Sequence, residues 1–150
     1  MMKASAIFLS FLICGTAFAG QYDSSPQVLI EAEYREYLSD FVAKDYEAIA
    51  SHFNPPIQRT NSEGSLVLQT KEEIVGMYQS MMRNIQEGYR YSEIDSMDIQ
   101  AMSSDTYAAD VSFTRYNADD EIIFRGRSIY LFGNQSGEWK MFSMIQAARE

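Results

Sequence analysis

The chain is 150 residues long and 46% hydrophobic, which suffices for one buried core of ordinary size. Its 12 Lys and Arg residues stand against 21 Asp and Glu residues, and the net charge of −9 makes nucleic acid and anionic membrane surfaces poor partners. No Gly, Ser or Pro-rich linker and no internal repeat divides the chain, so a single domain is predicted.

The first twenty residues have the organisation of a secretory signal peptide. Lys3 precedes an apolar run over residues 6–14, and Ala17-Phe18-Ala19 forms a small-residue cleavage site before Gly20. The apolar run is too short for a membrane anchor, which needs about 20 residues. We therefore predict a signal peptide over residues 1–19.

Removal of this segment changes the chemistry of the chain. The mature domain, residues 20–150, lacks the sole cysteine, Cys14, and so has no thiol nucleophile, thiolate ligand or disulfide. It also lacks Lys3, which leaves 11 basic residues against 21 acidic ones and a net charge of −10. We expect a soluble exported protein, periplasmic or secreted, with no membrane or nucleic-acid partner.

Two amphipathic helices are predicted at the start of the domain. Ser25 and Pro26 are a typical N-cap and first helical residue, and the first helix ends near Lys44. Asp45 caps the second helix, which ends before the prolines at positions 55–56, because proline disfavours the helical conformation in the residue before it. The apolar stripes are Ile30, Tyr34, Tyr37, Leu38 and Phe41 in the first helix and Tyr46, Ile49 and Phe53 in the second.

A β-hairpin and a third helix follow. The hairpin covers residues 57–69 and turns at the sequence Asn-Ser-Glu-Gly, residues 61–64. Thr70 and Glu73 fit a capping box for a helix that Gly88 can terminate. The apolar stripe of this helix is Ile74, Met77, Tyr78, Met81 and Ile85.

From Tyr89 onward the apolar pattern changes from helical to alternating. Strands are predicted over residues 89–101, 106–116, 122–132 and 139–147, and segments rich in Ser, Asp, Asn and Gly separate them. Three helices followed by a long antiparallel meander make an α+β fold.

This order of elements, from Val28 to Ala147, resembles the nuclear-transport-factor-2-like superfamily, which includes the SnoaL-type cyclases and ketosteroid isomerase. The resemblance is carried by the two helices in EYREYLSDFVAKDYEAIASHF, the NPP stop and the late GEWKMF segment. It implies a cone-shaped fold, with three N-terminal helices packed on a strongly curved antiparallel sheet and a pocket between them. It also implies a homodimer through the outer sheet face, which suits the apolar residues on both sides of the strand over residues 122–132.

The resemblance to ketosteroid isomerase places Tyr37 where that enzyme has its oxyanion-hole tyrosine, at the matching distance from Phe53. Asn61 stands at the position of the aspartate base, and a looser alignment puts Ser128 at the second, protonated aspartate. An amide cannot take a proton near neutral pH, so isomerisation by that mechanism is not expected. Tyr37 is either an electrophile or a core residue, and Asn61 either binds a ligand or caps its own turn.

Three arginines flank the predicted turn at residues 117–121. Arg115, Arg125 and Arg127 share one parity along their strands, so a hairpin that closes symmetrically would point all three to one face. Cations on an apolar face require anions, which are either a ligand carboxylate or acids of the chain itself. Arg127 is the candidate for the pocket, because a Gly-Arg pair in this strand recurs in SnoaL-like relatives.

The sole histidine, His52, lies near the end of the second predicted helix, where the helix C-terminus favours an imidazolium. It is either a surface or rim residue or a general base that needs a partner. One histidine without a mature cysteine does not make the usual zinc site, and no phosphate loop or dinucleotide motif is present. We predict neither a metal nor a cofactor.

Three functions are compatible with this sequence. The first is a binding domain for a small apolar or aromatic molecule with a polar or acidic end. The second is a lyase, isomerase or cyclase, in which Tyr37 polarises an oxygen and Asp110 moves the proton. The third is a non-catalytic dimeric interaction domain that works through its outer sheet. The expected pocket residues are Tyr37, Phe41, Asn61, Arg127 and Trp139.

Overall fold

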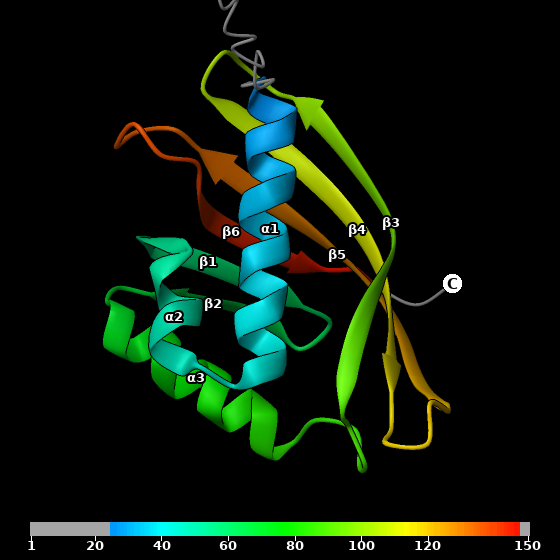
Figure 1. Cartoon of the computed structure of the whole chain (residues 1–150). Helices are drawn as coiled ribbons and strands as arrows, with labels where there is room; N and C mark the ends of the chain where they lie inside the picture. Colours follow the sequence, from blue (N-terminus) through cyan, green and yellow to red (C-terminus); the bar gives the residue numbers. More distant parts are fainter. Residues whose placement is uncertain (1–24, 148–150) are drawn as a thin grey trace, which may run out of the picture.

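The computed structural model describes residues 25–147, so the predicted signal peptide lies outside the described residues. Three helices and six strands follow one another in this region (Figure 1). None of the described helices is long and apolar enough to span a bilayer. The helices are α1 (Pro26–Ala43), α2 (Tyr46–Ser51) and α3 (Lys71–Arg83), and the strands are β1 (Phe53–Asn61), β2 (Gly64–Leu68), β3 (Tyr91–Ala101), β4 (Thr106–Tyr116), β5 (Ile122–Gly133) and β6 (Lys140–Gln146).

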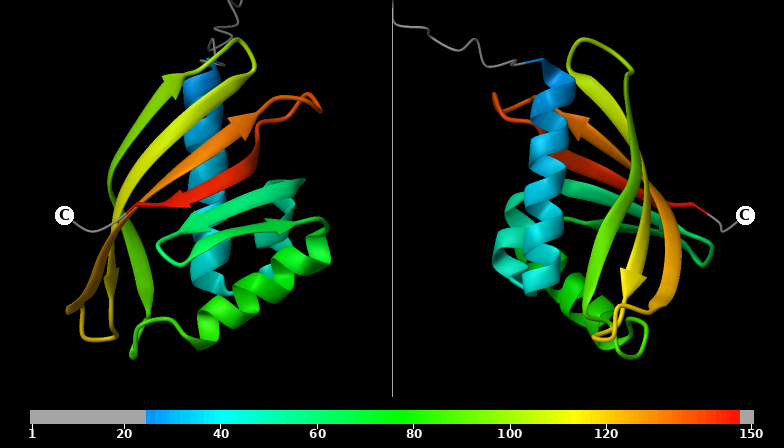
Figure 2. Two further views of the ribbon diagram at one scale, coloured as in Figure 1. Left: turned by 180° about the vertical axis from the view of Figure 1, so that it is seen from behind. Right: turned by 45° about the vertical axis from the view of Figure 1, so that its right-hand side comes forward.

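The strands form one sheet in the order β2-β1-β6-β5-β4-β3. All neighbours are antiparallel except β1 and β6, which run parallel because β6 returns to the sheet beside β1 after the β3–β5 meander. The long strands β3, β4 and β5 bend around α1, and α2 and α3 cover the other end of the concave face (Figure 2). The predicted α+β cone is confirmed, with one parallel pair in an otherwise antiparallel sheet.

Local signals set the ends of the first two helices. Pro26 is the first residue of α1, and Lys44 ends that helix in the left-handed conformation, with φ of 60°. The side chain of Asp45 accepts a hydrogen bond from the N–H of Ala48 (3.1 Å) and so caps α2. These boundaries agree with the prediction to within a residue.

The end of α2 differs from the prediction. Phe53, expected on the apolar stripe of the second helix, is the first residue of β1, since α2 ends at Ser51. Phe53 pairs with Met141 of β6, and the two prolines that follow have a fixed φ that suits an extended chain. The sheet therefore begins before the prolines rather than after them.

The capping box predicted for α3 is present in a shifted form. The hydroxyl of Thr70 accepts the N–H of Glu73 (3.2 Å), and the carboxylate of Glu73 accepts the N–H of Gln69 (2.6 Å) instead of that of Thr70. Two N–H groups at the start of the helix are thus satisfied by side chains.

The core between α1 and the concave face is largely aromatic. Tyr34, Tyr37 and Phe41 of α1 are buried against Phe53 and Tyr78. The ring of Tyr37 contacts those of Phe53 and Tyr78 edge to face, with centroids 5.9 and 6.2 Å apart. Because these side chains are large, they separate the helices from the curved sheet.

A buried ionic cluster joins α1 to the junction of α2 and β1. The ring of His52 is within hydrogen-bond distance of Glu33 through Nδ1 (3.0 Å) and of Asp40 through Nε2 (2.9 Å). Ionised carboxylates only accept hydrogen bonds, so both ring nitrogens donate and His52 is an imidazolium. Lys140 of β6 donates to the same Glu33 oxygen (2.7 Å). With both nitrogens engaged, His52 is neither a surface residue nor a general base.

The cluster shifts the pKa values of its members. Burial lowers the pKa of His52, but the hydrogen bonds to Glu33 and Asp40 outweigh burial and raise the pKa above its ordinary value. Burial raises the pKa of Glu33, and the hydrogen bonds from His52 and Lys140 outweigh it and lower that pKa. The stabilisation from His52 is therefore fully present below about pH 6.5, the ordinary histidine value, and is lost as the pH rises through the raised value.

We expect the substitution His52→Gln to lower the free energy of unfolding by about 2 kcal/mol at pH 6, because it removes the charge-assisted hydrogen bonds to the partly buried carboxylates of Glu33 and Asp40 and leaves Glu33 with Lys140 alone. The difference between the wild type and the variant should narrow at pH 9, where the wild-type ring has lost its proton. Urea unfolding at the two pH values measures both quantities.

The control for this experiment is Arg35→Gln. Arg35 pairs with Glu31 on the exposed face of α1 (2.7 Å), with the two side chains 58% and 47% exposed. Its loss should change stability by less than about 0.5 kcal/mol at either pH. If His52→Gln destabilised the protein equally at pH 6 and pH 9, the imidazolium assignment would be wrong.

Candidate functional site

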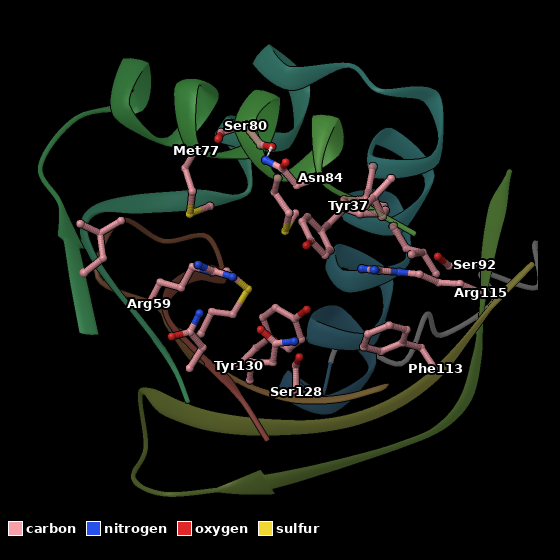
Figure 3. A pocket seen from close by; sticks show the side chains of 18 of the residues that line it. Tyr37, Arg59, Met77, Ser80, Asn84, Ser92, Phe113, Arg115, Ser128 and Tyr130 are labelled. Atoms are coloured by element: carbon pink, nitrogen blue, oxygen red, sulfur yellow. Dashed lines mark hydrogen bonds between the residues drawn. The ribbon is translucent and has the colours of Figure 1, made fainter. Parts of the chain in front are cut away.

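A cavity of about 710 Å³ lies between α1, α3 and the concave face of the sheet (Figure 3). Aromatic rings from α1, β4 and β5 form much of its wall, and methionines of α3 and β6 complete the apolar surface. Hydroxyl, amide and guanidinium groups interrupt this wall at separate points. The cavity therefore combines an aromatic and aliphatic surface with polar side chains from several elements, and small-molecule sites likewise combine the two.

Three of the five predicted pocket residues line this cavity, namely Tyr37, Phe41 and Asn61. Ser128, the residue aligned with the second aspartate of ketosteroid isomerase, lines it as well. The side-chain oxygen of Asn61 accepts the N–H of Glu63 (2.9 Å). Asn61 thus caps its own turn and also borders the cavity, so the two alternatives for this residue coexist.

The hydroxyl of Tyr37 forms a buried pair with the hydroxyl of Tyr78, 2.9 Å away. Burial raises the pKa of Tyr37 well above its ordinary value and raises that of Tyr78 as well, so both phenols are neutral at physiological pH. The hydroxyl of Tyr78 donates to the sulfur of Met144 (4.0 Å), so Tyr37 donates to Tyr78 and its own oxygen keeps the capacity to accept a hydrogen bond. Tyr37 is both a core residue and a neutral hydrogen-bonding group at the cavity wall.

Arg115 of β4 directs its guanidinium into the cavity, where Figure 3 shows it approaching from the side of β4 and β5. Its Nη1 donates to the side-chain oxygen of Gln86 (2.6 Å), and its Nε is buried without a hydrogen-bond partner. Within the described part of the chain Arg115 forms no ion pair. Burial lowers the pKa of this guanidinium, although an arginine stays protonated at any physiological pH.

Aromatic rings surround the Arg115 cation. Its central carbon lies 5.0 Å from the ring centroid of Phe124, 5.2 Å from that of Phe113 and 5.7 Å from that of Phe41. The ring of Tyr89 is 5.6 Å away. These ring faces offset part of the cost of burying the charge, but they accept none of its N–H groups as a carboxylate would.

The register of the β4–β5 hairpin contradicts the prediction for the three arginines. Arg115 is opposite Phe124, whereas Tyr116 is opposite Ile122, so Ile123 is an extra residue in β5. This bulge moves every later residue of β5 by one position relative to symmetric closure. Arg125 therefore lies on the face opposite to that of Arg115.

The same shift places Arg127 on the outer face of the sheet, where its Nε and Nη2 donate to the two oxygens of Asp110 (2.8 and 2.5 Å). The hydrogen bond from Arg127 lowers the pKa of Asp110. The prediction that Arg127 lines the pocket is wrong, and Asp110 is not placed to move a proton there. Trp139 is also outside the cavity, because it packs edge to face on Tyr107, with centroids 5.1 Å apart.

Sequence reasoning missed Arg59 as a cationic group of the cavity, and it named Arg127 rather than Arg115 as the arginine of the pocket, although it expected Arg115 on the apolar face. Arg59 of β1 enters from the wall facing Arg115 (Figure 3) and is partly buried. Its signal in the sequence was weak, since a single arginine in a hairpin strand reads as a surface residue. The signal for Arg115 was Phe113 two places before it, which marks the inward parity of β4.

The carboxylates in the lining are Glu63, in the turn between β1 and β2, and Glu73, in the first turn of α3. Between residues 25 and 147, no three His, Cys, Asp or Glu side chains gather in a way that would hold a metal ion. The polar chemistry of the cavity is therefore supplied mainly by arginine, tyrosine, serine and amide side chains.

Two solved structures from Nostoc punctiforme, each described as a protein or domain of unknown function with a cystatin-like fold, share 16% identity with this chain at a TM-score of 0.68. The alignments cover 85% and 80% of this chain, and 79% and 88% of the Nostoc chains. An NTF2-like protein with a cystatin-like fold from Novosphingobium aromaticivorans has a TM-score of 0.67 and 10% identity, over 83% of this chain and 82% of its own.

These likenesses concern the fold alone, because the identities are low. No functionally curated protein matches the chain. The sequence profile of one family, described as NTF2-like protein (DUF6841), matches residues 25–149. The chain therefore belongs to this family of NTF2-like proteins.

Proposed function

We propose that this domain binds a small apolar or aromatic molecule with a polar end in the cavity between its helices and its sheet. The cavity itself carries the proposal, because a volume of about 710 Å³ and a largely apolar wall are typical of sites for drug-sized ligands. The rigid sheet and α1 would supply a preformed wall, which lowers the entropic cost of binding.

The two kinds of lining suit the two parts of such a ligand. Met77 and Met81 of α3 and Met144 of β6 are flexible and polarisable, so they can adapt to an apolar ring or chain. Tyr37 and Ser128 offer hydroxyl groups to the polar end. A ligand in this position would lie along the concave face, with α1 and α3 above it.

Binding accounts for this site better than turnover does. The acid that the sequence suggested, Asp110, is paired on the outer face of the sheet. Of the lining carboxylates, Glu63 lies in the β1–β2 turn and Glu73 accepts the N–H of Gln69 at the start of α3, and the hydrogen-bond partner of Tyr37 is Tyr78 rather than an acid. Proton transfer requires an acid or base within about 3 Å of the reacting atom.

Native mass spectrometry of the mature protein, purified gently from its own host, is expected to show a retained small molecule. The substitution Ser128→Leu, which places a larger side chain on the inner face of β5, should lower the affinity for that molecule about tenfold or more by occupying its space. If no molecule is retained, the neutral aromatic compound 2-naphthamide serves as the probe in titration calorimetry.

The matched control is Ser112→Leu. Ser112 pairs with Arg127 and therefore shares its outward face, so the same change leaves the cavity intact and should leave binding unchanged. Equal affinities for wild type and Ser128→Leu would contradict the proposal, as would a wild type that retains no molecule and binds neither 2-naphthamide nor the corresponding acid, 2-naphthoate.

We also propose that the chain is exported and cleaved before Gly20, on the strength of its Ala17-Phe18-Ala19 sequence. The mature protein from the host should then begin at Gly20 when its N-terminus is sequenced. The substitution Ala19→Arg should leave the precursor uncut, because the last residue before the cut must be small, whereas Phe18→Leu should be processed normally. A cell-associated, full-length wild type would contradict export.

A further inference from the structure

Among the residues that line the cavity, Arg115 is the one whose side chain holds a buried nitrogen without a hydrogen-bond partner. An arginine has five N–H groups, and within residues 25–147 the hydrogen bond from Nη1 to Gln86 is the only one that Arg115 makes. Its Nε is buried without a partner. Arg115 is partly buried, and a buried donor without a partner destabilises a folded protein, so it persists where function requires it.

Arg127 shows how a guanidinium of this chain is satisfied when an acid is present. Its Nε and Nη2 donate together to the two oxygens of Asp110, at 2.8 and 2.5 Å. This two-point geometry is the preferred one between guanidinium and carboxylate. Arg115 has the same two donors, Nε and Nη2, and neither bonds to a residue in the described part of the chain.

The surroundings of Arg115 hold it in place without neutralising it. Phe113 and Phe124 stack at 6.0 Å with an angle of 28° between their rings, and both lie against the Arg115 cation. They reach this position because Gly126, opposite Phe113, has no side chain, and a Cβ there would be 2.5 Å from both rings. The site thus contains a cation, an oriented aromatic support and no internal anion.

We propose that Arg115 anchors the carboxylate of the bound molecule, which makes the ligand an organic carboxylic acid with an aryl or alkyl body. This inference rests on the proposed function. It specifies that the polar end of the ligand is a carboxylate and that this end lies at Arg115. The carboxylate receives hydrogen bonds from the guanidinium, where the surrounding rings exclude water and so strengthen the charge-assisted contact.

The opposite wall supports this orientation of the ligand. An apolar body that extends from Arg115 passes Tyr37 and Tyr130 and reaches the methionines of α3 and β6. Arg59 stands across the cavity, where it can receive a hydrogen-bond acceptor on the far part of the ligand. The buried Nε of Arg115 lacks a hydrogen-bond acceptor. We therefore place the carboxylate at Arg115 rather than at Arg59.

The test compares carboxylates with their neutral amides. Benzoate, 2-naphthoate and octanoate are each titrated against the wild-type protein at pH 7.5 by calorimetry, together with benzamide, 2-naphthamide and octanamide. At this pH the acids are ionised, and each amide has nearly the shape of its acid. For the pair that fits best, the carboxylate is expected to bind at least about tenfold tighter than the amide.

Two charge-removing variants locate the preference. Arg115→Gln should reduce the ratio of carboxylate to amide affinity to less than about threefold while the amide still binds, because only the charged contact is lost. Arg127→Gln removes an equal charge from the outer face and should keep the wild-type ratio. Arg115→Lys keeps the charge without the planar fork, and an intermediate ratio is expected.

A second readout separates this role from a structural one. Without ligand, Arg115→Met should unfold at the same temperature as the wild type or above it, since it removes an unpaired buried charge but keeps most of the side-chain volume. With the preferred carboxylate present, the wild type should gain thermal stability and Arg115→Met should not. A variant that unfolds earlier without ligand would identify Arg115 as a structural residue and overturn the proposal.

The remaining outcomes distinguish a failure of the Arg115 anchor from a failure of the proposed pocket function. Equal binding of carboxylates and amides by the wild type, or an unchanged preference in Arg115→Gln, would overturn the anchor and leave the proposed pocket function standing. A wild type that binds no member of any pair would overturn both. If the variants at Arg115 fail to fold, Arg59→Gln decides the question, because the anchor at Arg115 requires that this variant keep the wild-type preference for carboxylates and a lost preference would overturn it.

Discussion

One extra residue in β5 determines which charged side chains face the interior of this domain. Because Ile123 has no partner across the hairpin, Arg115 of β4 and Arg127 of β5 lie on opposite faces of the sheet. The outer arginine meets Asp110, and the inner one meets phenyl rings. A symmetric hairpin would have put Arg125 and Arg127 on the inner face with Arg115, and the three like charges would have needed acids of their own. The bulge leaves this part of the interior with a single, aromatic-flanked cation.

The aromatic character of the interior follows from the same geometry. A strongly bent sheet holds α1 away from its concave face, and large side chains such as Tyr34, Tyr37 and Tyr130 span part of the gap. Their hydroxyls must then be satisfied inside the protein, which the pair formed by Tyr37 and Tyr78 achieves without charge. The ionic cluster around His52 stands apart from this arrangement, because all of its nitrogen atoms and charges are internally paired. Structural charge and cavity charge are thus separated within one small domain.

Most of the fold could be predicted from the sequence because its signals are local. Pro26 and Asp45 mark helix starts, Thr70 with Glu73 marks another, and the alternating strands after Tyr89 define the meander. The parallel contact of β1 with β6 was not predictable in this way, since it depends on where the whole meander brings the chain back. Tyr37, Phe41 and Asn61 reached the cavity wall because the helix face and the turn that place them are local features. Arg127, Asp110 and Trp139 did not, because their facing depends on hairpin register and on the packing of the sheet's far end.

The contrast between Arg115 and Arg127 carries a more general argument about how a site can be recognised from the pairing of its charges. Both side chains belong to neighbouring strands of one sheet, and the chain has an excess of acids available to pair with either. Pairing is complete on the outer face, at a position about half exposed to water, where a salt bridge adds little stability. On the inner face Arg115 has no acidic partner among the described residues, and an unpaired cation there lowers the stability of the fold far more. Stability alone would favour the reverse distribution, with an acid beside the buried cation or an apolar residue in its place. The arrangement is therefore best understood as one that reserves the inner guanidinium for an anion from outside the chain.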